Sequence, residues 1–103
     1  MRDPLADWRG IDRADVRMGL QELEPGAAYP THHHPSPEIY MVLSGEARWS
    51  VGDRLIDAVP ETTIYTPPDT THRIENTGGT RLQWLYFWWA PNGDVSVFES
   101  GQR

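Results

Sequence analysis

The fold is decided by the stretch Thr31-His32-His33-His34-Pro35-Ser36-Pro37-Glu38. In an extended strand residues i and i+2 share a face, so His32 and His34 project together while His33 points away. The prolines of the stretch favour a tight bend, which can return the carboxylate of Glu38 to the side of the two imidazoles. The stretch therefore predicts a metal site that is completed by a ligand from another part of the chain.

The composition of the chain limits the chemistry of such a site. The 103 residues include no Cys, which excludes disulfides and thiolate ligands, and all nine cationic residues are Arg, which excludes Schiff-base chemistry on Lys. His72 is the one further histidine and can supply a third imidazole. Imidazole and carboxylate ligands suit one divalent transition metal ion, which can be Fe(II), Mn(II), Co(II), Ni(II) or Zn(II), without choosing among them.

Short strands are expected on both sides of this stretch. Turn-forming residues recur at Pro25-Gly26, Ser44-Gly45, Gly52-Asp53, Pro67-Pro68-Asp69, Asn76-Thr77-Gly78-Gly79 and Pro91-Asn92-Gly93. The segments between them that are rich in β-branched and aromatic residues are 15–23, 39–43, 47–51, 62–66 and 82–89. This pattern predicts an all-β sandwich or barrel, and no segment has the periodicity of an amphipathic helix.

Two of the expected strands indicate which side chains face the core. In residues 47–51 apolar and polar side chains alternate, so the inward residues are expected to be Ala47, Trp49 and Val51. Residues 82–89 are apolar on both faces, with Leu82, Trp84, Tyr86 and Trp88 on one and Leu85, Phe87 and Trp89 on the other. Because a chain of this length has one interior, the second face predicts contact with a second copy, and hence a homodimer.

The length and the net charge of the chain limit its domain organisation and its possible binding partners. The chain has room for one domain, placed at residues 15–103, preceded by an arm at 1–14 that Trp8 and Ile11 anchor. The net charge is −6 and the Arg residues are dispersed, so nucleic acid is not an expected partner. No apolar run has the length of a signal peptide or a membrane span, which predicts a cytoplasmic protein with no membrane partner.

The histidine stretch and its flanks resemble the first motif of the cupin family. That motif is Gly, five residues, His-x-His, three or four residues, Glu, six residues, Gly. Here every spacing is kept by Gly26, His32, His34, Glu38 and Gly45. The resemblance covers about residues 15–95, which is most of the chain.

Residues 67–76 are similar to the end of the second cupin motif, Pro-x-Gly-x-x-His-x-x-x-Asn. Pro67, His72 and Asn76 fall at the family positions, and Asp69 stands in place of the glycine. Glu61 stands where this motif begins with another glycine. Neither departure falls on a position that binds metal in the family.

The resemblance carries an expectation for both the fold and the site. It implies a double-stranded β-helix, or jelly-roll, barrel that encloses the metal. The metal ligands that it implies are His32, His34, Glu38 and His72.

Tyr40 is the candidate catalytic residue, because it follows Glu38 by two residues and so shares its face. The chain has a weaker similarity to dimethylsulfoniopropionate lyases, in which a Tyr at this offset is thought to act as the base in a β-elimination. A packing or hydrogen-bonding role for Tyr40 is the alternative. Inward rings can bind a cationic substrate or can simply fill the barrel, and those in question are Trp49, Trp84, Tyr86 and Trp88.

These features leave functional hypotheses of different classes. The first is a metal-dependent enzyme on a small polar or anionic organic molecule, either a lyase or isomerase that uses the metal as a Lewis acid or an Fe(II) dioxygenase. The second is a non-catalytic domain that binds or senses a small ligand through the metal. A purely structural metal is the third, and it is disfavoured because structural sites usually have closed coordination. A second Tyr or carboxylate near the metal would favour acid/base chemistry.

Overall fold

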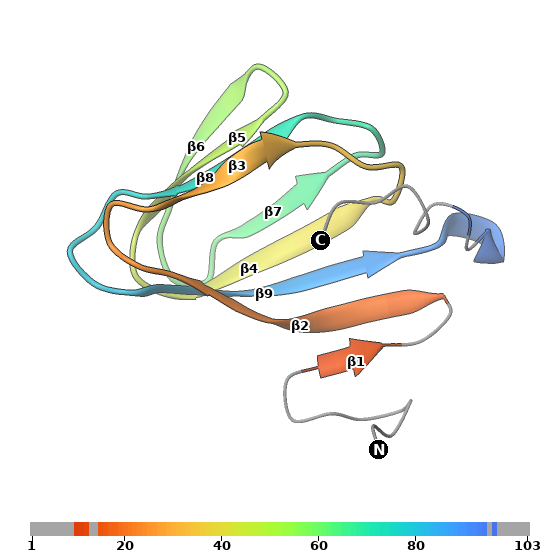
Figure 1. The fold of residues 1–103 in the computed structure, drawn as a ribbon, viewed down its shortest axis with the longest axis horizontal. Helices are drawn as coiled ribbons and strands as arrows, with labels where there is room; N and C mark the ends of the chain where they lie inside the picture. The colour runs from red at the N-terminus through yellow and green to blue at the C-terminus, as the bar shows by residue number, and fades with distance from the viewer. Residues whose placement is uncertain (1–9, 13–14, 95, 97–103) are drawn as a thin grey trace.

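The computed structural model of the protein describes residues 10–12, 15–94 and 96, and only the backbone of residues 10–12. These residues form two antiparallel sheets that face each other (Figure 1). The strands are β1 (Gly10–Asp12), β2 (Val16–Leu23), β3 (Ala28–His32), β4 (Glu38–Ser44), β5 (Ala47–Val51), β6 (Arg54–Ala58), β7 (Thr63–Thr66), β8 (His72–Asn76) and β9 (Leu82–Trp89). A short 3-10 helix, η1 (Pro91–Gly93), follows β9. This part of the chain contains no helix with the length and apolar character that a membrane span requires.

The order of the strands is that of a jelly roll. One sheet has the order β1-β2-β9-β4-β7 and the other the order β3-β8-β5-β6, so most neighbours in space are distant in the sequence. The chain therefore passes repeatedly between the two sheets, as Figure 1 shows for β2 into β3 and for β8 into β9. The predicted all-β fold, a double-stranded β-helix barrel, is confirmed.

The five strands predicted from composition are all present, with ends that differ by at most one residue. The strands β1, β6 and β8 were not predicted, because their residues give no clear alternation, and β3 was anticipated only at its end, where an extended backbone was expected at His32. Their extended backbone is stabilised by pairing with partners far along the chain. β1 pairs with β2, so part of the expected arm is an edge strand. Trp8 and the side chain of Ile11 lie outside the described residues.

The core between the sheets is built on large rings. Ala47, Trp49 and Val51 are 2%, 0% and 9% exposed, which confirms the predicted inward face of β5. Trp49 packs edge-on against Trp84 with the ring centroids 5.5 Å apart, and Tyr40 lies 5.0 Å from Trp49. Edge-to-face contacts of this kind suit the quadrupoles of the rings. These rings fill the middle of the barrel and confine the polar groups to its ends.

Asn76 fastens the end of the barrel away from the histidines. Its side-chain nitrogen donates to the carbonyls of Leu23 and Thr80, both at 2.9 Å, and its side-chain oxygen accepts from the amide of Gly78 at 3.0 Å. The side chain is buried, so these hydrogen bonds join the loops after β2 and after β8 where no water replaces them. The asparagine of the second motif therefore has a structural role.

Both departures from the family motif fall on left-handed backbone. Glu61 has φ 76° and Asp69 has φ 55°, conformations that glycine adopts without steric cost. The amide of Asp69 donates to the carbonyl of His34 at 2.8 Å, so this turn supports the loop that carries a candidate ligand. At Gly45 the family glycine is present. A Cβ at this position would lie 2.9 Å from the carbonyl oxygen of Arg81, which is too close for any other residue without a shift of the backbone.

Replacing Glu61 with glycine is expected to stabilise the protein. The left-handed conformation costs a non-glycine residue about 1–2 kcal/mol, which exceeds the extra backbone entropy that glycine loses on folding. Glu61→Gly should therefore raise the free energy of unfolding by about 0.5–1 kcal/mol in a urea titration. Glu46→Gly is the matched control, because Glu46 is exposed with negative φ, and it should lower that free energy. A loss of stability in both variants would contradict the explanation.

Candidate metal centre

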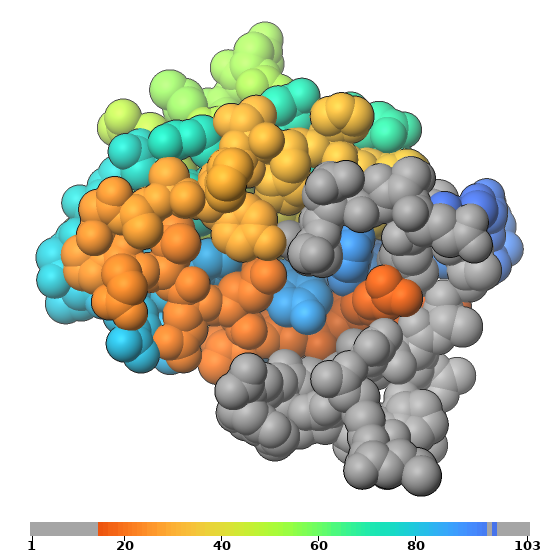
Figure 2. Space-filling model, in the orientation of Figure 1, coloured from red at the N-terminus to blue at the C-terminus, as the bar shows by residue number. Residues whose placement is uncertain are grey.

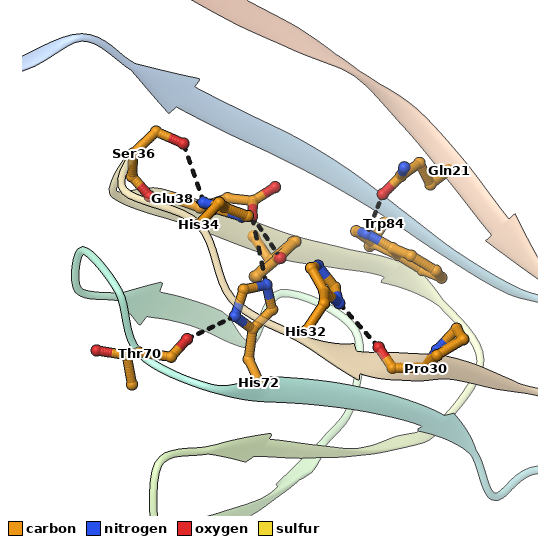
Figure 3. A network of polar contacts seen from close by, with 10 residues as sticks. Gln21, Pro30, His32, His34, Ser36, Glu38, Thr70, His72 and Trp84 are labelled. Carbon is orange, nitrogen blue, oxygen red and sulfur yellow. Dashed lines mark hydrogen bonds and ion pairs between the residues drawn. The ribbon is translucent and has the colours of Figure 1, made fainter. Parts of the chain in front are cut away.

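The four predicted ligands lie at one end of the barrel, between the two sheets. His32 ends β3 and His72 begins β8, and the two are directly opposed in the four-stranded sheet. His34 lies in the loop after β3, and Glu38 begins β4 in the other sheet. Figure 3 shows the side chains of these residues turned toward one another. Strand pairing thus brings His72 to residues that precede it by more than thirty positions.

The three histidines form a compact group that could hold a metal ion. Their candidate ligand nitrogens lie within 4.8 Å of one another. The ring centroids of His32 and His34 lie 4.1 Å and 5.0 Å from that of His72. Oε1 of Glu38 lies 3.0 Å from Nε2 of His34 and 3.8 Å from Nε2 of His72. His33 is exposed and outside the group, as predicted, although β3 ends at His32 and both His33 and His34 lie in the loop that follows.

Hydrogen bonds to the backbone fix how each imidazole presents its nitrogens. In every case Nδ1 lies within hydrogen-bond distance of a carbonyl oxygen: Pro30 for His32 at 2.8 Å, Ser36 for His34 at 2.9 Å and Thr70 for His72 at 2.9 Å. Because a carbonyl only accepts, each of these contacts favours a proton on Nδ1, and Nε2 of His34 also lies within hydrogen-bond distance of the carboxylate oxygen Oε1 of Glu38. Metal-binding histidines are commonly oriented in this way.

The residues fit a divalent cation. Nε2 of His72 is buried and makes no hydrogen bond with the described residues. Burial lowers the pKa of His72 to about 4, so the imidazole is neutral at pH 7 and its lone pair is available. The separations of 3.0 and 3.8 Å from Glu38 are close to the ~3.0–3.6 Å between neighbouring ligand atoms that each lie about 2.1 Å from one ion.

Tyr40 holds the Glu38 carboxylate. Its hydroxyl donates to Oε1 of Glu38 at 2.6 Å, and both side chains are 0% exposed. Burial, and then the nearby Tyr29, raise the pKa of Tyr40 well above its usual value, because a phenolate would be poorly solvated there. Tyr40 is therefore protonated at neutral pH in the metal-free protein and serves as a hydrogen-bond donor.

The four rings predicted to form a substrate pocket differ in their positions. Trp49 and Trp84 are 0% exposed and belong to the core beneath the histidines. The Trp88 ring lies 5.0 Å from the ring of His34, and Tyr86 is half-buried directly opposite Tyr40 on β9. The rings nearest to the candidate ligands are thus those on the second half of β9.

Several polar residues near the centre were missed in the sequence. Oγ of Ser36 lies 3.0 Å from Nδ1 of His34. Thr66 is opposite Glu38 on β7, and its hydroxyl is buried without a hydrogen bond to any described residue. Arg17 is opposite Trp88 on β2. The period of two in the 15–23 strand puts Arg17 on the same face as Gly19 and Gln21. Only the pairing of Arg17 with Trp88 on β9 shows that this face is the one near the site.

Comparison with known proteins establishes the family. Residues 19–88 match the cupin domain. This match covers more than half of the chain, and the protein therefore belongs to the cupin family, as the two motifs indicated.

Three relatives show the range of proteins that share this domain. Protein MJ1618 of Methanocaldococcus jannaschii, whose function is uncharacterized, is 36% identical over 65% of this chain and 55% of its own length. Auxin-binding protein 1 of Arabidopsis thaliana is 28% identical over 82% of this chain and 48% of its own. The structure of the DMSP lyase DddQ of Ruegeria pomeroyi DSS-3 superimposes with a TM-score of 0.68 at 26% identity, over 75% of this chain and 39% of its own. The chain thus spans about half the length of the curated relatives named here.

Proposed function

We propose that this protein is a metal-dependent enzyme that acts on a small organic acid, as a lyase or an isomerase. The observation that carries the proposal is the convergence of three imidazoles, each with Nδ1 against a backbone carbonyl, with the carboxylate of Glu38. His32, His34, His72 and Glu38 would hold the ion. When bound, such an ion supplies Lewis acidity, which polarises a carboxylate or carbonyl group next to it.

Proton transfer would be the task of Tyr40. Its hydroxyl is already directed at the candidate ligand Glu38, within 2.6 Å of Oε1. With a raised pKa it can donate a proton to negative charge that develops on the substrate, and a cation nearby would lower that pKa and allow the phenolate to act as a base. Tyr86 and Trp88 would line the space beside it.

Further tyrosines around the centre favour acid/base chemistry over oxygen chemistry. The ring of Tyr29 lies 5.3 Å from that of His32, and Tyr86 is directly opposite Tyr40. A site with several hydroxyl groups suits proton transfer, whereas an Fe(II) dioxygenase needs mainly an open position for dioxygen. The likeness to a DMSP lyase supports the same choice.

A non-catalytic ligand-binding domain is the second candidate. It is favoured by the similarity to auxin-binding protein 1, which extends over 82% of this chain. In that case the metal would anchor a carboxylate without turnover, and Tyr40 would only hold Glu38 in place.

The ligand set is tested by thermal unfolding with and without metal. Saturating divalent metal should raise the melting temperature of the wild type by about 4–8 °C for each kcal/mol of binding stabilisation. His72→Ala and Glu38→Ala should lose most of this increment, because each removes one proposed ligand from the folded state. His33→Ala, at an exposed position in the same stretch, should keep it. Equal losses in all three variants would point to nonspecific binding by the histidine stretch.

The role of Tyr40 is tested by turnover. The metal-loaded protein is incubated with a panel of small organic acids that includes dimethylsulfoniopropionate, and consumption is followed by proton NMR. For a substrate that is consumed, Tyr40→Phe should lower the rate about 100-fold or more while most of the metal-induced rise in melting temperature remains. Tyr65→Phe, which removes an exposed hydroxyl on β7, is the control. Turnover that requires dissolved oxygen would assign a dioxygenase, and binding without turnover a ligand-binding domain.

A homodimer through the outer face of the five-stranded sheet is also proposed. Three neighbouring strands carry apolar side chains on that face: Val16, Met18 and Leu20 on β2, Leu85, Phe87 and Trp89 on β9, and Ile39, Met41 and Leu43 on β4. Leu20 and Leu43 are each 41% exposed. A contiguous apolar face of this kind is unusual on a monomer, and a stable interface should bury at least about 1,000 Å² in total.

Light scattering at micromolar concentration should therefore give the mass of a dimer. Leu20→Arg places a charge in the proposed interface and should shift the mass toward that of the monomer. Leu55→Arg makes the same change at a residue that is 69% exposed on β6, in the other sheet, and should leave the dimer intact. A wild-type monomer would refute the interface.

A further inference from the structure

A row of four side chains crosses the inner face of the five-stranded sheet at the end where the histidines lie. Thr66 is directly opposite Glu38, Glu38 is opposite Trp88, and Trp88 is opposite Arg17. Directly opposed residues on antiparallel strands project from the same face of a sheet. Thr66, Glu38 and Trp88 are 1%, 0% and 2% exposed, so this is the inner face. Arg17 therefore belongs to the same layer of the barrel as the candidate metal ligand Glu38.

Arg17 and His34 both lie against the ring of Trp88. Its guanidinium carbon lies 6.0 Å from the centroid of the Trp88 ring, and that ring lies 5.0 Å from the ring of His34. A guanidinium over the face of an indole is held by cation–π attraction, which orients it at little cost in hydration. Arg17 is half-buried, so its charge is less screened than that of a surface Arg.

The charges of the row favour an anion between Arg17 and the metal centre. A divalent ion outweighs the single negative charge of Glu38, and Arg17 adds a further positive charge on the same face. A guanidinium also donates two parallel hydrogen bonds, a geometry that matches a carboxylate or a phosphate. The backbones of Glu38 and Arg17 are two strand spacings apart, which is about 10 Å. An acid with two anionic groups could place one at the ion and the other at Arg17.

Part of β9 lies at the surface between β2 and β3. In the space-filling view atoms of β9 (blue) are visible between those of β2 below and β3 above (Figure 2). Within the row, Arg17 is the residue that is partly exposed, whereas Trp88, Glu38 and Thr66 are buried.

We propose that Arg17 binds a second acidic group of the ligand, so that the site takes a small acid with two anionic groups. One carboxylate would lie at the centre formed by the histidines and Glu38, and the other acidic group, a carboxylate or a phosphate, would pair with Arg17. This inference rests on the proposed function, because it needs an anion anchored at the metal. It adds a specificity-determining residue and narrows the substrate class.

The test compares dicarboxylic acids with monocarboxylic acids of the same chain length. The metal-loaded wild type is titrated calorimetrically with malonate, succinate and glutarate, and with propionate, butyrate and pentanoate as matched controls. At least one dicarboxylate should bind about tenfold or more tightly than its matched monocarboxylate, the effect expected from a charge-assisted hydrogen-bonded pair. Arg17→Gln should abolish this preference and leave the affinity for the monocarboxylate within about twofold. Arg17→Lys, which keeps the charge but not the planar fork, should restore part of it.

The outcomes separate this inference from the proposed function. If the wild type binds monocarboxylates and dicarboxylates equally, or if Arg17→Gln keeps the preference, Arg17 has no role in recognition while the metal-anchored site stands. If neither kind of acid binds the metal-loaded protein, the proposed function fails together with the inference. The metal-induced rise in melting temperature verifies that each variant is folded. Should Arg17→Gln fail to fold, the preference of the wild type and its reduction in Arg17→Lys decide the matter.

Discussion

The rest of the structure depends on the antiparallel pairing of β3 with β8, which places His32 directly opposite His72. This pairing brings together the first motif, which contains His32, and the second motif, which contains His72, although the two lie far apart in the sequence. The hydrogen bond from the amide of Asp69 to the carbonyl of His34 reinforces it, because it ties the turn before β8 to the loop after β3. Once these segments are joined, β4 brings Glu38 to the same end from the opposite sheet. The centre is thus a consequence of how the sheets close.

Burying a carboxylate at this place is costly unless its charge is compensated. Glu38 is 0% exposed and accepts from Tyr40, with Nε2 of His34 3.0 Å away. Desolvation of an ion in a protein interior costs several kcal/mol, and hydrogen bonds or a cation must offset it. The aromatic core beneath the site excludes water and so strengthens the electrostatic interactions within it. A divalent ion would make this end of the barrel more stable, which is why metal content and stability should be linked in this protein.

Some strands of this jelly roll could be predicted from the sequence and others could not. The inward face of β5 follows from the alternation in residues 47–51, and the two apolar faces of β9 from residues 82–89. In contrast, β3 and β8 carry Pro30, histidines and charged residues, and their strand state arises from pairing with distant partners. Glycine positions in the motif were also informative, since Glu61 and Asp69 keep the left-handed backbone that glycine would favour. In β3 and β8 the intrinsic strand propensity of the residues is low, and pairing with distant strands outweighs it.

The sequence by itself determined the fold class and the group of histidines. The spacing of His32 and His34 and the absence of Cys and Lys are properties of the chain that no folding alters. Only the tertiary structure decided which nitrogen of each imidazole lies against a backbone carbonyl, that Tyr40 donates to Glu38, and that Arg17 shares a row with Trp88 and Glu38. The physical reason is register. Along a strand, side chains alternate between the two faces of the sheet, and the sequence shows this alternation. The neighbour of a side chain on the next strand depends on which residues pair, and that pairing forms only when distant segments meet in the folded barrel.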